Sequence, residues 1–195
     1  MDFAALSRNI DEEIGSRLIG IRRQGDDDLV VTLEFEDSAL NGRTRQVELR
    51  CHLVVESNCQ IGWVGLIDCH SRHPLLLKHH EPHSQLFFSS APASAGEVYL
   101  AAHASIASVL QGWRHPASVL CSPPERFESL LSSGNGVLAY GPDTVIQALA
   151  KALDGMLQIN AVPTQVFGER TQRQAVILGE YWVVCDSVDV LELPH

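Results

Sequence analysis

Two segments of alternating side chains constrain the fold more than any other feature of this sequence. Residues 29–36 and 47–56 each alternate apolar and polar positions, which is the period of a β-strand with one buried face. Between them stands Asn41-Gly42, a pair that readily takes the positive φ of a hairpin turn. The sequence therefore predicts an antiparallel meander in which Cys51 faces the core and His52 faces water.

Helical and strand-like segments surround this meander. Apolar side chains recur at helical spacing in four segments, at residues 2–14, 97–113, 124–131 and 143–156. Further strand-like segments lie at residues 17–23, 85–90, 137–140, 158–167, 175–178, 181–184 and 188–193. We predict an α+β fold, with an antiparallel β-meander in the first half packed with three to four helices and a further β-hairpin near the C-terminus.

One globular domain spanning residues 1–195 is expected from the length of the chain. The alternative is two lobes, a β-rich lobe of residues 1–91 and a helix-rich lobe of residues 92–195 that carries the C-terminal hairpin. The Ala-Pro-Ala-Ser-Ala-Gly segment at residues 91–96 is the best candidate boundary.

Further along, Ser122-Pro-Pro-Glu125 matches a capping box that opens a helix, and Gly134 is expected to end it.

Charge and cysteine content narrow the class of protein. The formal charge is -10, which argues against general nucleic-acid binding and is compatible with a basic protein partner. The first residues do not resemble a signal peptide, and the weakly polar segment 98–110 is too short to cross a bilayer. Five irregularly spaced cysteines are typical of reduced thiols. We expect a cytoplasmic protein without membrane association, and the sequence leaves a homo-oligomer open.

Residues 69–83 stand out because they hold five of the nine histidines and one cysteine. Zinc needs three or four such ligands converging on one point. His79 and His83 are one helical turn apart, but Pro82 between them disfavours a helix. The segment matches neither the zincin motif nor the complete zinc deaminase motif. A zinc-dependent hydrolase remains as the alternative function, with Cys69, His70, His79 and His83 as ligands.

Cys121 is a second place where chemistry is conceivable. It precedes a predicted helix N-terminus, where the helix dipole would stabilise a thiolate, and His115 lies six residues upstream. Ser122 as a helix cap explains the same local sequence without any reactivity. His103 lies at the margin of an apolar helical stripe, which favours a partly buried structural histidine.

No catalytic template accounts for these residues, so we predict a non-enzymatic cytoplasmic protein without cofactors that binds another protein, as an accessory factor or as an inhibitor of the immunity type. A basic partner would complement the acidic chain. Aromatic and arginine side chains tend to anchor interfaces. The candidate contact residues are Trp63, Arg72, His79, His80, Glu81, His83 and Trp113.

Overall fold

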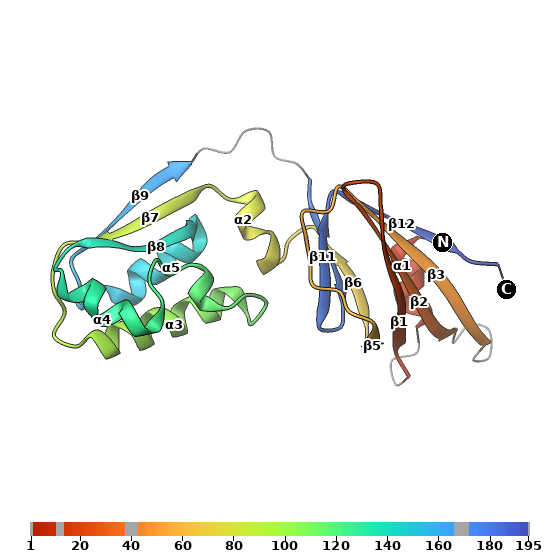
Figure 1. The fold of residues 1–195 in the computed structure, drawn as a ribbon, viewed down its shortest axis with the longest axis horizontal. Helices are drawn as coiled ribbons and strands as arrows, with labels where there is room; N and C mark the ends of the chain where they lie inside the picture. Colours follow the sequence, from red (N-terminus) through yellow and green to blue (C-terminus); the bar gives the residue numbers. More distant parts are fainter. Residues whose placement is uncertain (1, 11–13, 38–42, 166–171, 195) are drawn as a thin grey trace. The chain divides into compact units, whose positions relative to one another are not determined.

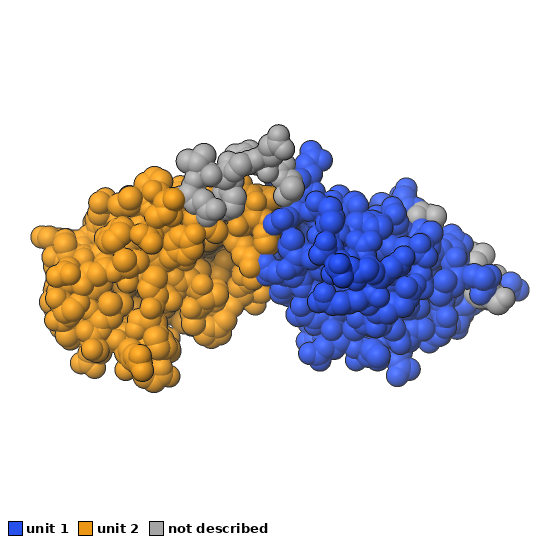
Figure 2. Space-filling view, turned by 45° about the horizontal axis from the view of Figure 1, so that its top comes forward, with its two compact units in different colours: residues 1–76, 171–195 blue, residues 77–170 orange. Residues whose placement is uncertain are grey.

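The chain forms two compact units in a computed structural model (Figure 1). The structure describes residues 2–10, 14–37, 43–165 and 172–194. Unit 1 comprises residues 1–76 and 171–195, and unit 2 comprises residues 77–170, as coloured in Figure 2. Unit 2 is therefore an insertion between two parts of unit 1.

Two antiparallel sheets build unit 1. The first has the strand order β12-β3-β2-β1-β5 and the second the order β4-β11-β10-β6. The strands of the first sheet are β1 (Ser16–Gln24), β2 (Asp28–Asp37), β3 (Arg43–His52), β5 (Gly62–Val64) and β12 (Ser187–Glu192). The strands of the second are β4 (Glu56–Ser57), β6 (Ile67–His70), β10 (Gln174–Leu178) and β11 (Tyr181–Cys185).

The predicted meander is confirmed as β1, β2 and β3. Leu33 and Leu49 project from its inner face into a core that also contains Val176 and Val183 of the second sheet. Cys51 is buried in the same core. The predicted hairpin near the C-terminus is also confirmed, because β10 and β11 pair across the turn at Gly179-Glu180. Helix α1 (Phe3–Asn9) lies against this unit through buried Leu6.

Two boundaries in unit 1 differ from the prediction. Helix α1 ends at Asn9, short of residue 14, because Ile10 is extended and forms a β-bridge with Asp37. Strand β3 ends at His52, and Leu53 is exposed with a φ of 52°. The first residue of β2 holds the chain at this point, because the Asp28 carboxylate accepts a hydrogen bond from the Leu53 N–H. The predicted Asn41-Gly42 turn lies outside the described residues.

A three-stranded sheet and three helices build unit 2. The strand order is β8-β7-β9, and Figure 1 shows the helices gathered on one face of this sheet. The strands are β7 (His83–Phe88), β8 (Gly136–Pro142) and β9 (Ile159–Gln165). The helices are α3 (Ala95–Leu110), α4 (Pro124–Ser132) and α5 (Asp143–Leu153). Unit 2 also contains the short elements α2 (Leu77–His80) and η3 (Pro116–Ser118), and η2 (Pro74–Leu76) ends the first part of unit 1. Leu86, Ile106, Leu138 and Ile146 form part of the core of this unit.

The helix starts of unit 2 are stabilised differently from the prediction. The expected capping box at Ser122 is wrong, because the Ser122 hydroxyl donates to the Pro123 carbonyl and α4 has no side-chain cap. Gly134 does take the left-handed conformation just past α4, as expected, with a φ of 74°. Ser94 caps α3 by accepting a hydrogen bond from the Glu97 N–H.

The α+β prediction is confirmed, with antiparallel sheets and helices in both units. The units divide at residues 76/77 and 170/171, whereas the sequence suggested residue 91 as the boundary between two lobes. Strand β7 lies before residue 91 but is the central strand of the sheet in unit 2. This pairing assigns the strand to the helix-rich unit.

Candidate functional site

Three large apolar side chains are exposed close together in the sequence of unit 1. Ile61, Trp63 and Leu66 retain 64%, 60% and 53% of their accessible surface, and we call this group the β5 surface. Ile61 and Trp63 are two residues apart around strand β5, which is the last strand of its sheet. Ile61 lies in the bend just before β5 and Trp63 is the middle residue of the strand, so two exposed apolar side chains lie within three residues at this edge of the sheet.

The Trp63 indole is held in place by a glycine on the neighbouring strand region. A Cβ atom at Gly15 would lie 2.7 Å from Cζ2 of the indole, so the ring rests against the bare backbone of that residue. Gly15 also has a φ of 70°, a conformation that favours glycine. Trp63 is therefore an exposed aromatic side chain whose ring is supported by the Gly15 backbone.

Polar residues border the β5 surface. Arg17 is the register partner of Trp63 on β1 and is exposed. On the other flank, the Gly179 N–H donates to the Leu66 carbonyl, which brings the turn that carries exposed Glu180 next to Leu66. An apolar centre with a polar rim is the usual anatomy of a protein-binding surface.

The acidic charge of the chain is concentrated in unit 1. Its sequence contains seventeen Asp and Glu residues and nine Arg residues, a formal charge of -8. Unit 2 contains seven acidic and five basic residues, a formal charge of -2. The unit that carries the β5 surface is therefore the one that attracts positively charged molecules.

The histidine-rich stretch is divided between the two units. Cys69 and His70 lie on β6, and Arg72 is exposed in the bend that follows. The Cys69 thiol donates to the side-chain carbonyl of Gln174 at 3.0 Å, and burial raises the pKa of this thiol to about 11. The His70 imidazole contacts the Asp68 carboxylate at 3.2 Å and stacks on the His73 ring.

In unit 2 the predicted contact residue Glu81 has a structural role. Its carboxylate accepts hydrogen bonds from both the N–H and the hydroxyl of Thr144, at 3.0 and 2.7 Å, in the first turn of α5. A carboxylate in this position satisfies a free donor of the helix and complements its dipole. Glu81 thus caps α5 from a distant part of the chain.

The neighbouring histidines of unit 2 are partly buried. His83 lies 3.1 Å from the Tyr140 hydroxyl through its Nδ1, and burial lowers the pKa of its imidazole. His79 and His80 lie on the single turn of α2 and are half-buried. Trp113 is likewise half-buried, directly after α3, where its N–H donates to the Leu110 carbonyl. Among the predicted contact residues, Trp63 and Arg72 are thus the exposed ones.

The four ligands of the alternative zinc site fall in different units, Cys69 and His70 in unit 1 and His79 and His83 in unit 2. Within the described ranges, no group of three or more His, Cys, Asp or Glu side chains has an arrangement that could hold a metal ion. The geometry therefore gives the zinc alternative no support.

His52, which the sequence predicts only to face solvent, contacts two carboxylates. Its Nδ1 lies 2.9 Å from the Asp28 carboxylate and its Nε2 lies 3.0 Å from the Asp189 carboxylate. Hydrogen bonds with Asp189 and Asp28 raise the pKa of the imidazole. Both ring nitrogens thus lie against carboxylates, an arrangement that favours the protonated imidazole.

Cys121 is exposed, and desolvation raises the pKa of its thiol. The expected stabilisation of a thiolate by the following helix is therefore not found. His115 accepts a hydrogen bond from the Ala117 N–H through Nδ1 and so caps η3. Its ring packs edge-on against His103, which in turn contacts Tyr99. His103 is half-buried, as the sequence predicts.

None of the described helices has the length and apolar character needed to cross a membrane. Comparison with known proteins gives no family model, curated protein or solved structure that matches this chain.

Proposed function

We propose that this protein is a non-enzymatic protein-binding protein of the cytoplasm whose unit 1 takes a partner through the β5 surface. The observation that carries the proposal is the exposure of Trp63, at 60%, between Ile61 and Leu66. Tryptophan is enriched among the residues that dominate binding energy. Its support by Gly15 means that little side-chain entropy is lost when a partner covers it.

The chemistry of unit 1 favours a partner with a basic rim. A formal charge of -8 accelerates encounter with positively charged proteins and makes association sensitive to salt. All five cysteines are free thiols, which supports a reducing compartment.

The test is to capture the stoichiometric partner from the native host with the tagged protein and to measure its affinity with purified components. Trp63→Ala is expected to raise Kd at least about tenfold, the effect of losing an anchoring aromatic residue. Leu100→Ala is the matched control, because Leu100 is 68% exposed but lies on α3 in unit 2. The control is expected to bind as the wild type does.

Salt provides an independent measurement. Raising the ionic strength from about 50 to about 500 mM shortens the Debye length severalfold and is expected to weaken the wild-type complex. A partner that binds Trp63→Ala with unchanged affinity would contradict the proposed binding surface. A complex whose affinity does not change with salt would contradict the basic rim of the partner.

A further inference from the structure

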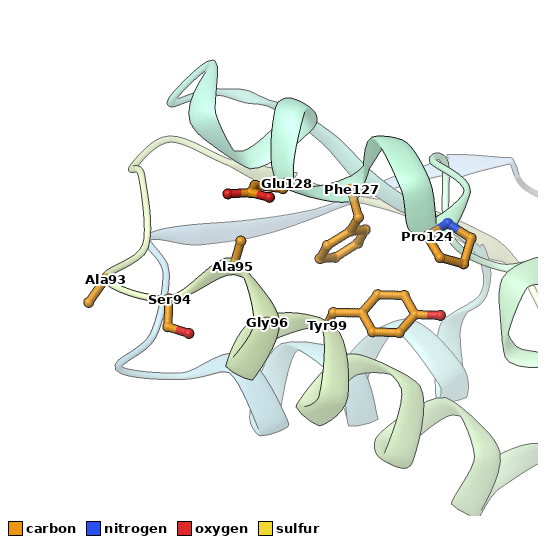
Figure 3. Close-up of a pocket in the computed structure, with 8 residues that line it drawn as sticks. All are labelled: Ala93, Ser94, Ala95, Gly96, Tyr99, Pro124, Phe127 and Glu128. Atoms are coloured by element: carbon orange, nitrogen blue, oxygen red, sulfur yellow. The ribbon is translucent and has the colours of Figure 1, made fainter.

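A pocket of about 480 Å³ lies in unit 2 between the first turns of α3 and α4 (Figure 3). Its walls are formed by short side chains of the segment that leads into α3 and by residues of α4. The lining residues are Ala93, Ser94, Ala95, Gly96, Tyr99, Pro124, Phe127 and Glu128. The volume falls within the range of small-molecule sites. None of the residues of the β5 surface lines this pocket.

Gly96 borders the pocket on the α3 side. A Cβ atom built on Gly96 would meet no other atom within 4 Å, so the space next to its backbone is empty. The two residues before it, Ser94 and Ala95, are also small.

Two aromatic rings form one wall of the pocket. The Tyr99 and Phe127 rings pack edge to face with their centres 5.1 Å apart. Phe127 is buried, which anchors the pair in the core of unit 2. In Figure 3 the Tyr99 hydroxyl points away from Gly96, along α3 toward Pro124.

The only charged residue among the eight that line the pocket is Glu128. Across the part of the chain that the structure describes, no hydrogen bond or ion pair engages the Glu128 carboxylate or the Tyr99 hydroxyl. Ser94, by contrast, already accepts the Glu97 N–H, and Glu97 in the first turn offsets the positive end of the α3 dipole. The pocket thus combines aromatic surface with a negatively charged hydrogen-bond acceptor, the Glu128 carboxylate.

We propose that this pocket binds an organic cation, an alkylammonium group on a short apolar stem. The Glu128 carboxylate would accept from the ammonium group, while the Tyr99 ring contributes a cation–π contact and the small apolar residues cover the stem. The same carboxylate disfavours anions. The ammonium group can come from a free amine or from a lysine side chain of another protein.

The test uses n-butylammonium, n-butanol and butyrate as probes that differ in their polar group. Binding is followed by NMR at the amide resonances of Ala95 and Gly96. A dissociation constant on the order of 1 mM is expected for n-butylammonium, which has few atoms to bury. Butanol and butyrate are expected to bind at least about fivefold more weakly, because one charged contact is worth about 1 kcal/mol.

Two variants and one control locate the site. Glu128→Gln keeps the shape of the side chain and is expected to weaken n-butylammonium binding about fivefold or more. Gly96→Leu fills the pocket with a good helix former and is expected to abolish binding. Glu125→Gln removes an equal charge from α4 outside the lining and is expected to leave binding unchanged.

Lack of saturation by n-butylammonium, equal binding of butanol, or unchanged binding by Glu128→Gln would each overturn the proposal. A second probe separates the two sources of the ligand. If Nα-acetyl-lysine methylamide binds as tightly as n-butylammonium, the pocket accepts a lysine side chain of a protein. If only the free amine binds, the ligand is a small molecule.

Discussion

The ion pair between Arg45 and Asp37 offers the sharpest test of what stabilises unit 1. The Arg45 guanidinium donates to the Asp37 carboxylate at 2.6 Å and also to Glu192 of β12. The Asp37 side chain has no exposed surface, and that of Arg45 retains 16%. Hydrogen bonding to Asp37 raises the pKa of the guanidinium. Arg45 and its two carboxylate partners therefore join three strands of one sheet, with Asp37 buried and Glu192 half-exposed.

Arg45→Met removes the charge but keeps most of the apolar stem. The buried Asp37 carboxylate then loses its arginine, and breaking a buried pair in this way costs about 3–5 kcal/mol. Because Arg45 keeps some contact with water, we expect about 3 kcal/mol, the lower end of that range. The free energy of unfolding is measured by urea denaturation followed by circular dichroism.

The matched control is Arg22→Met. Arg22 pairs with Glu48 at 2.9 Å, but 51% of its side chain is exposed. Exposed pairs contribute about 0–1 kcal/mol, so the control is expected to lose less than about 1 kcal/mol. In an Asp37→Asn background the Arg45→Met change is expected to cost less, because no buried charge remains. Equal losses for Arg45→Met and Arg22→Met would refute this account of the pair.

Three further changes test other parts of the structure. His52 has a raised pKa in the folded protein, so its contribution to stability is complete below about pH 6.5 and is lost as the pH rises through the raised value. The unfolding free energy of the wild type minus that of His52→Gln should therefore be larger at about pH 5.5 than at about pH 9. A constant difference would contradict the stabilising contact of His52 with Asp28 and Asp189. Glu81→Ala is expected to destabilise α5 by about 1 kcal/mol, visible as faster amide hydrogen exchange in its first turn, whereas unchanged exchange would show that the cap is dispensable. Gly15→Ala forces a strained φ and displaces the Trp63 ring, so a cost of about 1–3 kcal/mol and a shifted tryptophan emission are expected, and an unaltered spectrum would be inconsistent with the contact.

Several residues show why the candidate site could be predicted only in part. Trp63 was expected in a contact surface because aromatic residues anchor interfaces, and it is exposed. Nothing in the sequence indicates that Ile61 and Leu66 are exposed as well, because large apolar side chains are most often buried. The position of Gly15 against the indole depends on the pairing of β1 with β5, which joins residues almost fifty positions apart.

The partners of His52 and Glu81 could not be predicted from the sequence, for a related reason. The partners of His52 come from the start of β2 and from β12, and the partner of Glu81 is Thr144 at the start of α5. No local sequence pattern predicts such contacts, because they form only when strands and helices that are distant in the sequence lie next to each other in the folded protein. The Ser122 capping box fails likewise, because the Cys121 N–H bonds to the Leu138 carbonyl of β8 and fixes the backbone before the helix starts.

The sequence by itself determined the type of most elements. Alternation placed the inner faces of β2 and β3, helical spacing placed α3 and α5, and the left-handed Gly134 ended α4. These are local properties, because side-chain period and turn preference depend on a few consecutive residues. Tertiary structure alone decided that β7 belongs to unit 2, that β12 completes the sheet of the meander, and that the histidine-rich stretch runs from one unit into the other. The physical reason is that strand partners are chosen by burial of apolar faces and pairing of backbone groups across long sequence separations, which no local period records.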